Sequence, residues 1–429
     1  MNGSSIKEAR QMRFMWLAHA VPYPPKAGFL LRSYNLLREL ARYHTVDLVA
    51  FIQEHWISTH FLTLTEGLRE SQRALQEFCR RVTFLPIDRI NRPWGKQLTA
   101  LQSLVTASSY TATWLRSSSA RAALARELAA EDYDLVHFDT IGLAAYRDLV
   151  GSLPATLTHH NVESHLLLRR AESAGNVLAR SYFRHEGRML RDVERRTAAQ
   201  FAAHITCSEL DTERLREIVP EANIVVIPNG VDCDYFASAQ TTVRPDSLIF
   251  VGTMNWYPNV DAMLFLLQEV WPQLKRRTRT VTLDIVGSNP PDSLVRLAQS
   301  LPGVTVHGYV PDVRPLLDSA ALFVCPIRDG GGTKLKLLDA FAMGKCVVAH
   351  PIACEGIDAV ADREVVVAST PAEFVTTISA LLADPHRRRA VGQAARALVE
   401  RSYSYRSIGA QFSSLLEQTA QRATPVPST

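Results

Sequence analysis

The sequence has no apolar run of the about 18 residues that a membrane-spanning helix needs. Its six cysteines are scattered along the sequence, and no two have the spacing of metal ligands. We expect them to be reduced residues of the core. They are Cys79, Cys207, Cys233, Cys325, Cys346 and Cys354. The net charge of +4 is too small to indicate a nucleic-acid partner, but it suits small anionic ligands.

A secretory leader is a superficial possibility near the start of the chain. Lys7, Arg10 and Arg13 precede the apolar residues Phe14–Leu17. The run is only a few residues long and soon meets His19, whereas the apolar part of a signal peptide takes about 7–15 residues. We therefore predict a first buried strand here and a cytoplasmic protein, with contact to the inner face of the membrane left open.

Two nucleotide-binding signatures are also absent. Neither Gly-x-x-x-x-Gly-Lys-Ser/Thr nor Gly-x-Gly-x-x-Gly after the first strand occurs. The chain of 429 residues is longer than one ordinary core requires, so two domains are expected. Its 47% hydrophobic and 21% charged residues are typical of a soluble globular enzyme rather than a disordered chain.

Short apolar segments alternate with longer helical patterns, which predicts parallel sheets built from βαβ units. The strands expected in the first half are Arg13–Ala20, Thr45–Phe51, Val82–Pro86, Asp134–Phe138, Thr156–His159, His204–Cys207 and Ile224–Ile227. Those of the second half are Ser247–Gly252, Val281–Gly287, Val304–Val306, Ala321–Cys325, Cys346–Ala349 and Glu364–Val367. Helical patterns include Leu30–Tyr43, Pro258–Lys275 and Ser402–Gln421.

This alternation predicts an α/β fold of two doubly wound, Rossmann-like domains that face a cleft. We expect an N-terminal domain at 1–228, a second domain at 229–401, and a C-terminal helix and tail at 402–429 that returns to the first domain. Ligands of such sheets gather at the carboxyl ends of the strands.

A glycine-rich loop joins the strand Ala321–Cys325 to a helical run and is the most informative segment. Glycines let backbone amides turn toward a ligand, and a helix N-terminus adds partial positive charge. Lys334 and Lys336 bring full charges, and Asp339 follows as an acceptor for sugar hydroxyls. An ordinary tight turn would not need these residues, so we predict a nucleotide-diphosphate site. Its diphosphate-binding residues would be Gly330, Gly331, Gly332, Thr333, Lys334 and Lys336.

Two polar segments of the first half also follow predicted strands. The proline-stiffened turn Pro22–Gly28 follows the first strand, and Arg32 in the next helix could reach an anion. The cluster His159–Glu163 closes another strand. We expect His160 to contact a substrate, as a hydrogen-bond donor more than as a base.

Acidic and basic clusters elsewhere carry weaker signals. Asp232 with Asp234, and Asp132 with Asp134, spell Asp-x-Asp, a pattern that can hold a metal but recurs easily by chance. We expect no metal. The stretch from His165 to Arg196 contains eight arginines and reads as a solvated helix pair, with contact to an anionic membrane as the alternative.

The whole chain resembles the GT-B-fold retaining glycosyltransferases of the glycogen-synthase-like superfamily, family 4, and most closely a bacterial branch associated with exopolysaccharides. The landmarks occur in the right order along the chain. They are Pro24–Gly28, His160–Glu163, Asn229–Asp232, Phe250–Gly252, His307–Val310, the Gly-Gly-Gly-Thr-Lys-Leu-Lys segment and Asp339 with the Ala-Phe-Ala-Met-Gly that follows it.

The resemblance implies that Asp339 binds the ribose of the donor. Gly331 stands where the family has a glutamate that contacts the donor sugar, and Asp329 is the nearest substitute. The family's Arg and Lys diphosphate clamp is also missing from the segment Thr253–Asn259. We infer that lysines of the glycine loop replace it.

The resemblance further implies metal-independent sugar transfer from a UDP- or GDP-sugar, which is a substrate, with no cofactor. The acceptor would be a glycan or a lipid-linked molecule, and the anomeric configuration would be retained. His160 and Lys336 would be the catalytic residues. Tyr309 and Val310 would contact the base, and the sugar or acceptor would meet Gly28, Arg32, Asn161, Glu163 and Asp329. The alternatives are a nucleotide-sugar 2-epimerase of the same fold and a degenerate sugar-nucleotide binder.

Overall fold

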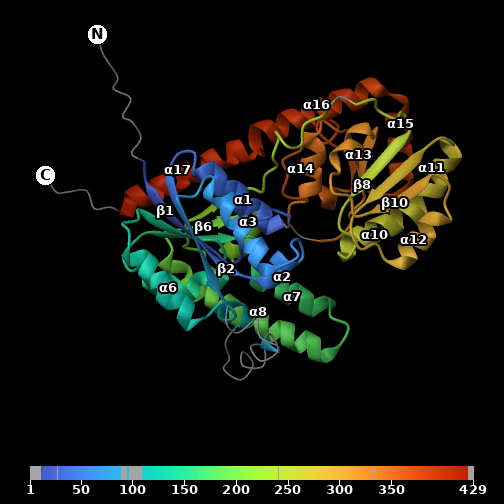
Figure 1. Ribbon diagram of the computed structural model, residues 1–429. Coiled ribbons are helices and arrows are strands. Elements are labelled where there is room, and N and C mark those ends of the chain that lie inside the picture. The colour runs from blue at the N-terminus through green and yellow to red at the C-terminus, as the bar shows by residue number, and fades with distance from the viewer. Residues whose placement is uncertain are drawn as a thin grey trace, which may run out of the picture. The chain divides into compact units, whose positions relative to one another are not determined.

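The computed structural model describes residues 11–26, 28–87, 94–95, 109–239, 241–330 and 332–423. The chain forms two compact units, shown in Figure 1. Unit 1 comprises Met1–Ile227 with Gly409–Thr429, and unit 2 comprises Pro228–Ile408. The sequence placed its divisions at 228/229 and 401/402, whereas the contacts divide the chain at 227/228 and 408/409.

Unit 1 is built on a parallel sheet of seven strands in the order β3-β2-β1-β4-β5-β6-β7. The strands are β1 (Arg13–Ala18), β2 (Thr45–Ile52), β3 (Arg81–Pro86), β4 (Leu135–Phe138), β5 (Ala155–His159), β6 (Ala203–Thr206) and β7 (Ile224–Val226). Every predicted strand of the first half is present, since each is an apolar run; the central strands are buried, and the edge strands β3 and β7 are largely half-buried.

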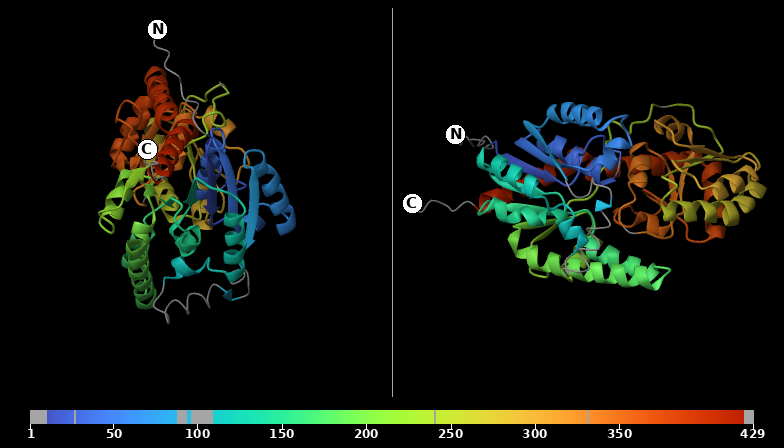
Figure 2. Two further views of the ribbon diagram at one scale, coloured as in Figure 1. Left: turned by 90° about the vertical axis from the view of Figure 1, so that its left-hand side faces the viewer. Right: turned by 60° about the horizontal axis from the view of Figure 1, so that its bottom comes forward.

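The helices of unit 1 connect these strands. They are α1 (Gly28–Leu40), α2 (Glu54–Ser58), α3 (Leu64–Gln76), α5 (Tyr110–Thr113), α6 (Ser118–Ala129), α7 (Glu163–Ser173), α8 (Val177–Thr197) and α9 (Glu209–Arg216), with 3-10 turns η1 (Ile141–Val150) and η2 (Ala198–Gln200). The arginine-rich stretch forms the predicted helix pair, in which α7 and α8 lie side by side (Figures 1 and 2).

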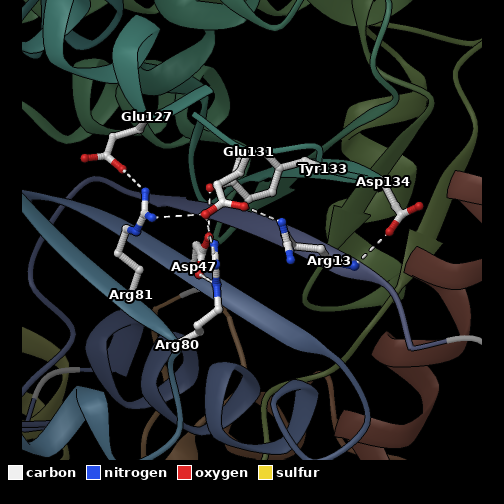
Figure 3. Close-up of polar contacts among 8 residues, drawn as sticks. All are labelled: Arg13, Asp47, Arg80, Arg81, Glu127, Glu131, Tyr133 and Asp134. Atoms are coloured by element: carbon white, nitrogen blue, oxygen red, sulfur yellow. Dashed lines mark hydrogen bonds and ion pairs between the residues drawn. The ribbon is translucent and has the colours of Figure 1, made fainter. Parts of the chain in front are cut away.

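An ion-pair network lies at the amino edge of the unit 1 sheet (Figure 3). The carboxylate of Asp47 is buried, pairs with Arg80 and accepts a hydrogen bond of 2.8 Å from the Tyr133 hydroxyl. Arg80 and Arg81 both donate to Glu131 Oε1, at 2.9 and 3.0 Å. The remaining members are Arg13, Glu127 and Asp134, and each has a partner in the network. The charges at this edge therefore satisfy one another.

Unit 2 contains a parallel sheet of six strands in the order β10-β9-β8-β11-β12-β13. They are β8 (Ser247–Val251), β9 (Thr282–Val286), β10 (Val304–Gly308), β11 (Leu322–Cys325), β12 (Val347–Ala349) and β13 (Val366–Val367). The six strands predicted for the second half are all confirmed. Figure 1 shows α10 and α12 on one side of these strands and α14 on the other, as right-handed crossovers from a central strand pair require.

The helices of unit 2 are α10 (Tyr257–Phe265), α11 (Trp271–Arg277), α12 (Asp292–Gln299), α13 (Arg314–Ser319), α14 (Leu335–Ala342), α15 (Pro371–Ala383) and α16 (Pro385–Ser402), with a 3-10 turn η4 (Pro351–Cys354). The predicted single helix Pro258–Lys275 is interrupted by a π-helical segment η3 (Leu266–Val270). Pro272 lies two residues after this segment and has no backbone N–H to continue the α-helical bonding, which accounts for the change of register.

The last helix, α17 (Tyr405–Ala423), returns to unit 1 as the sequence predicted. Phe412 packs against Trp16 with ring centroids 5.6 Å apart, and the Ser413 hydroxyl lies 2.9 Å from His44 Nε2. All six cysteines are unpaired, and four are buried as expected while Cys233 and Cys354 are half-buried. Within the described ranges, no helix combines the length and apolar character needed to cross a membrane.

Candidate functional site

The site of unit 2 begins at the centre of its sheet. β8 and β11 are hydrogen-bonded neighbours, and the strand order reverses between them. The connections that leave their carboxyl ends turn to opposite faces, which opens a crevice where ligands of doubly wound sheets bind. The segments that follow these strands, Gly252–Asn259 and Pro326–Lys334, are therefore the first places to look for chemistry.

The glycine loop after β11 is held in shape by its own residues. Gly330 and Gly332 adopt positive φ angles of 104° and 72°, which other residues reach only with strain. Lys334 is only 3% exposed, and its Nζ donates hydrogen bonds of 2.8 Å to the carbonyl oxygens of both glycines. Asp329 accepts a hydrogen bond of 2.6 Å from the Gly330 amide. Lys334 thus braces the loop, and Asp329 caps its turn.

Lys336 lies at the same edge but points toward β8. Its Nζ donates to Asn259 Oδ1 and lies 4.8 Å from the centre of the Phe250 ring and 5.7 Å from that of Trp256. A β-carbon on Gly252 would lie 2.8 Å from this Nζ, so a side chain there would require the amine to shift. Burial lowers the pKa of Lys336 to about 8, because its surroundings compensate the positive charge less well than water does.

Asp339 lies on α14 three residues after Lys336, which places the two side chains on the same helix face. Burial raises the pKa of Asp339 to about 7, although the charge of Lys336 lowers it. Thr333 Oγ1 is also buried at the start of this segment and has no hydrogen-bond partner among the described residues. The Thr333 hydroxyl is therefore unsatisfied, and burial shifts the pKa values of the Lys336 amine and the Asp339 carboxyl group toward their neutral forms, which is typical of a site for a polar ligand.

The other predicted residues of unit 2 lie further from this centre. Tyr309 follows β10, is 66% exposed, and is separated from β8 by β9. Val310 is half-buried and packs against the core. Gly331, where the family glutamate is expected, lies outside the described residues.

Unit 1 has an equivalent reversal of strand order between β1 and β4. His19 follows β1, Asp139 follows β4, and His160 follows β5. Asp139 Oδ1 lies 3.3 Å from His160 Nε2, and Asp139 Oδ2 lies 3.8 Å from His19 Nδ1. The Ser33 hydroxyl of α1 donates to Asp139 Oδ2 over 2.7 Å. Topology thus gathers two imidazoles around one buried carboxylate.

The two histidines of this cluster differ in the direction in which their pKa values are shifted. Burial lowers the pKa of His160, but the charge of Asp139 outweighs burial and brings the value to about 9. Burial lowers the pKa of His19 to about 4. At neutral pH, His160 is therefore an imidazolium and His19 a neutral ring. His19 Nδ1, Asp139 and His160 Nε2 lie within 4.8 Å of one another, a spacing that cation sites also show.

Four further predicted residues of unit 1 have varied surroundings. Gly28 is exposed at the start of α1. Arg32 is 1% exposed and donates a hydrogen bond of 2.7 Å to the carbonyl oxygen of Ile227. Asn161 is half-buried before α7. Glu163 accepts a hydrogen bond of 3.2 Å from Thr140, and burial raises its pKa.

The two Asp-x-Asp segments have structural partners. Asp232 Oδ1 accepts hydrogen bonds from the amides of Asp234 and Tyr235, which closes a turn. Asp134 accepts the Arg13 amide over 2.8 Å at the amino edge of the sheet.

Sequence reasoning missed His19, Asp139, Asn259 and Trp256. A signal was present for Asp139, because it is a carboxylate directly after an apolar strand, Leu135–Phe138. Its partners, however, come from β1 and β5, and only the strand order brings them together. Asn259 could not be recognised without knowing that Lys336 reaches it from α14.

Comparisons with known proteins agree with this architecture. The family model "Glycosyltransferase Family 4" matches residues 33–235, and "Glycosyl transferases group 1" matches residues 245–384. A curated relative, the GDP-mannose-dependent alpha-(1-6)-phosphatidylinositol monomannoside mannosyltransferase of Mycolicibacterium smegmatis, is 30% identical over 221 residues. That match covers 46% of this chain and 57% of the relative, so the chain spans little more than half the length of this relative.

Solved structures extend the likeness to nearly the whole chain. A glycosyltransferase from Rickettsia africae gives a TM-score of 0.63 at 13% identity over 96% of this chain and 99% of its own. Alr3699/HepE of Anabaena in complex with UDP gives 0.63 at 13% identity, covering 95% of this chain and 100% of its own. TarM gives 0.66 at 12% identity over 96% and 100% of the two chains. The strand orders and these neighbours show that the chain has a GT-B fold, and the two family matches show that it is similar to glycosyltransferases over residues 33–235 and 245–384.

Proposed function

We propose that the protein transfers a sugar from a nucleotide-diphosphate sugar to a glycan or lipid-linked acceptor. The observation that carries this proposal is the position of Lys336. Its amine lies at the carboxyl end of β8, against Gly252 and Asn259. The family's clamp residues belong to this segment, and here the cation comes from α14 instead. A buried amine with a lowered pKa gains most from an anionic ligand, and a diphosphate is such a ligand.

The chemistry needs stabilisation of the leaving diphosphate, where negative charge develops in the transition state. Lys336 supplies a full charge, and the amides of the glycine loop supply donors. These groups take the part that a divalent cation plays in other transferases, so the proposed reaction is metal-independent. Lys334 contributes by fixing the loop through its bonds to Gly330 and Gly332.

The donor's other parts are assigned by family likeness. Asp339 accepts hydrogen bonds from the ribose, and Tyr309 with Val310 contacts the base. Asp329 stands in for the missing glutamate toward the sugar. The relative's name specifies GDP-mannose and the Anabaena neighbour binds UDP, which supports a GDP- or UDP-sugar. From unit 1, His160 donates a hydrogen bond to the donor sugar, while Gly28 and Asn161 face the sugar or acceptor.

Retention of the anomeric configuration follows from the same likeness, with the acceptor entering on the face from which the diphosphate leaves. Exclusion of water during transfer would limit hydrolysis of the donor. We place the activity in surface or exopolysaccharide biosynthesis. The 2-epimerase alternative is not favoured, because both family models that match the chain describe glycosyltransferases.

Turnover tests the proposal. The protein is incubated with labelled UDP- and GDP-sugars, with and without a lipid-extract or glycan acceptor, and nucleotide release and labelled product are followed. Acceptor-dependent release with transfer of the label is expected. Binding without release under every acceptor would favour a degenerate binder, and conversion of the free nucleotide sugar would favour an epimerase. Product stereochemistry by NMR tests retention.

We also propose that the α7–α8 hairpin contacts an anionic membrane to reach a lipid-linked acceptor. Val177 and Leu178, at the start of α8, are 76% and 84% exposed, and Arg180 lies two residues after Leu178. Such a tip suits insertion of apolar side chains beneath anionic headgroups. Cosedimentation with phosphatidylglycerol vesicles should exceed that with phosphatidylcholine vesicles, and the double change of Val177 and Leu178 to Ser should abolish the difference. A preference for phosphatidylglycerol vesicles that the variant keeps at the wild-type level would contradict this contact.

A further inference from the structure

We propose that Asn259 is a positioning residue that aims the Lys336 amine at the donor diphosphate without neutralising its charge. This inference rests on the proposed function and deepens it, because it names the residue through which the β8 side of the unit 2 sheet acts on that ligand. The contact of Asn259 is with the amine, so it reaches the diphosphate only through Lys336.

The side-chain amide of Asn259 is fixed in one orientation. The residue is 3% exposed in the first turn of α10, where its backbone N–H donates over 3.0 Å to the carbonyl oxygen of Trp256. Its Nδ2 donates over 2.7 Å to the carbonyl oxygen of Thr253. A carbonyl oxygen only accepts and an ammonium only donates, so Nδ2 must face Thr253 and Oδ1 must face Lys336.

Gly252, which follows β8, gives the amide and the amine their room. A β-carbon there would lie 2.8 Å from Lys336 Nζ and 2.9 Å from Asn259 Nδ2. Both groups therefore lie against the backbone of the segment that follows β8. The amide thus holds an amine from α14 beside the carboxyl end of β8, at the crevice between β8 and β11.

The side of the amine that faces β8 and α10 is polar or aromatic but uncharged. Phe250 and Trp256 present their ring faces, with centres 4.8 and 5.7 Å from Nζ. Asp261, the only acidic residue of these two elements, pairs with Arg328 at 3.1 Å. Because the Asn259 amide accepts a hydrogen bond without carrying charge, the amine keeps its attraction for an anionic ligand.

The groups that face Lys336 from α14 and β11 do not neutralise it either. Lys334 is a like charge and lowers the pKa of Lys336. Burial raises the pKa of the Cys325 thiol to about 11, so the thiol is neutral at pH 7. Burial also raises the pKa of Asp339 to about 7, so its charge is incomplete at neutral pH. Asn259 is therefore the group that directs the amine, and the ligand is left to balance its charge.

Isothermal titration of nucleotide diphosphates tests the inference. At pH 7.5, Asn259→Ala should bind UDP or GDP, whichever binds the wild type more tightly, about tenfold more weakly, because the amine loses its direction. The affinity for the matching monophosphate should stay at the wild-type level. Asn35→Ala is the matched control and should change neither affinity, because Asn35 is also buried and donates over 2.8 Å to a backbone carbonyl, but lies on α1 of unit 1.

A double-mutant cycle identifies the group through which Asn259 acts. Asn259→Ala added to Lys336→Ala should cause no further loss of diphosphate affinity, because no amine is left to direct. An equal loss in both backgrounds would overturn the inference, since Asn259 would then act through the turn at Thr253. If Asn259→Ala does not fold, Gly252→Ala repeats the test, because its β-carbon displaces the same amine and amide. An unchanged diphosphate affinity in Gly252→Ala would then overturn the inference.

The titration of Lys336 separates this role from simple packing. NMR of protein labelled with ¹³C-lysine, with Lys336→Ala identifying the resonance, should give a pKa of about 8 in the wild type. Asn259→Ala removes an acceptor of the charged amine and should lower this pKa, whereas Asn259→Asp adds a negative charge and should raise it by about one unit. Asn259→Asp should nevertheless bind the diphosphate about tenfold more weakly, because its carboxylate neutralises the amine.

Two outcomes of these measurements would contradict the role of Asn259. One is a Lys336 pKa that neither Asn259 variant changes. The other is diphosphate binding by Asn259→Asp at the wild-type level. Failure of the proposed function is distinguishable from both, because it would appear as binding of neither UDP nor GDP by the wild type, while the NMR comparison still shows whether Asn259 acts on the amine.

Discussion

The two edges of each sheet treat buried charge differently. At the amino edge of unit 1, Asp47 has an arginine and a tyrosine hydroxyl as partners (Figure 3). At the carboxyl edge, Asp139 faces two histidines whose facing nitrogens lack well-aligned hydrogen bonds among the described residues. The charged groups of the amino edge pair with one another, whereas those of the carboxyl edge are arranged to bind a ligand.

Unit 2 repeats the contrast with two lysines, the buried Lys345 and the half-buried Lys336. Lys345, at the amino edge, donates to the carbonyl oxygens of Asp318 and Ala320 and lies 4.0 Å from the Asp318 carboxylate. Lys336, at the carboxyl edge, donates to Asn259 Oδ1 and otherwise faces the rings of Phe250 and Trp256. Lys345 therefore stabilises the fold, whereas Lys336 is available to bind a ligand. Incomplete satisfaction, rather than charge alone, locates the candidate sites.

The largest expected effect is on stability at the amino edge. Asp47→Asn leaves Arg80 beside a neutral amide and should lower the free energy of unfolding by about 3 kcal/mol. Urea denaturation measures this. Asp148→Asn is the matched control, because its ion pair with Arg121 is exposed and should contribute about 0–1 kcal/mol. Equal losses in the two variants would remove the distinction between a buried network and a surface pair.

The next effect is on the pH dependence of nucleotide-diphosphate binding. Above pH 8 the free protein loses the Lys336 cation, so affinity should fall up to tenfold for each pH unit. Below pH 7 Asp339 becomes protonated and loses an acceptor, so affinity should fall there as well. Isothermal titration from pH 5.5 to 9.5 should give a maximum between about 7 and 8.

Two variants assign the limbs of this profile. Lys336→Arg keeps its charge above pH 8 and should flatten the alkaline limb. Asp339→Asn should flatten the acidic limb alone. If neither variant changes the pH profile, the titrations of Lys336 and Asp339 do not control nucleotide-diphosphate binding.

The smallest effect concerns the loop backbone. Gly330→Ala forces a side chain into φ 104° and within 3.3 Å of Trp256 and Pro258, which should cost about 1 kcal/mol and weaken nucleotide-diphosphate binding about fivefold. Gly151→Ala is the control, because its φ of 59° is also positive but open space surrounds it. The control should lose similar stability and no affinity. A matching loss of affinity in Gly151→Ala would mean that strain, not loop shape, is being measured.

The sequence predicted most of the architecture because its signals are local. Each strand is an apolar run between turn residues, and the arginine-rich stretch shows helical spacing over its whole length. Pro272 is an exception. The proline is visible in the sequence, but its position alone does not predict that the helix Pro258–Lys275 is interrupted by a π-helical segment. The predicted helix pair and the helical run near the C-terminus are present for the same local reasons.

The candidate sites were only half accessible from the sequence. Lys336 could be singled out because it follows three glycines, but its partner Asn259 lies 77 residues earlier in the chain. Likewise, His160 was conspicuous beside a strand end, whereas Asp139 and His19 become its neighbours only through the order β1-β4-β5. Strand order is a property of the whole sheet, and no local pattern encodes it.

One titration tests the central claim, that Lys336 holds the diphosphate of a donor. UDP, UMP, GDP and GMP are titrated into the wild type, Lys336→Ala and Lys345→Ala. For the wild type and Lys345→Ala, the diphosphate should bind about 100-fold more tightly than the monophosphate, as one charge-assisted phosphate contact allows. In Lys336→Ala that preference should nearly vanish while the fold remains intact. A preference retained in Lys336→Ala, or lost equally in Lys345→Ala, would contradict the account.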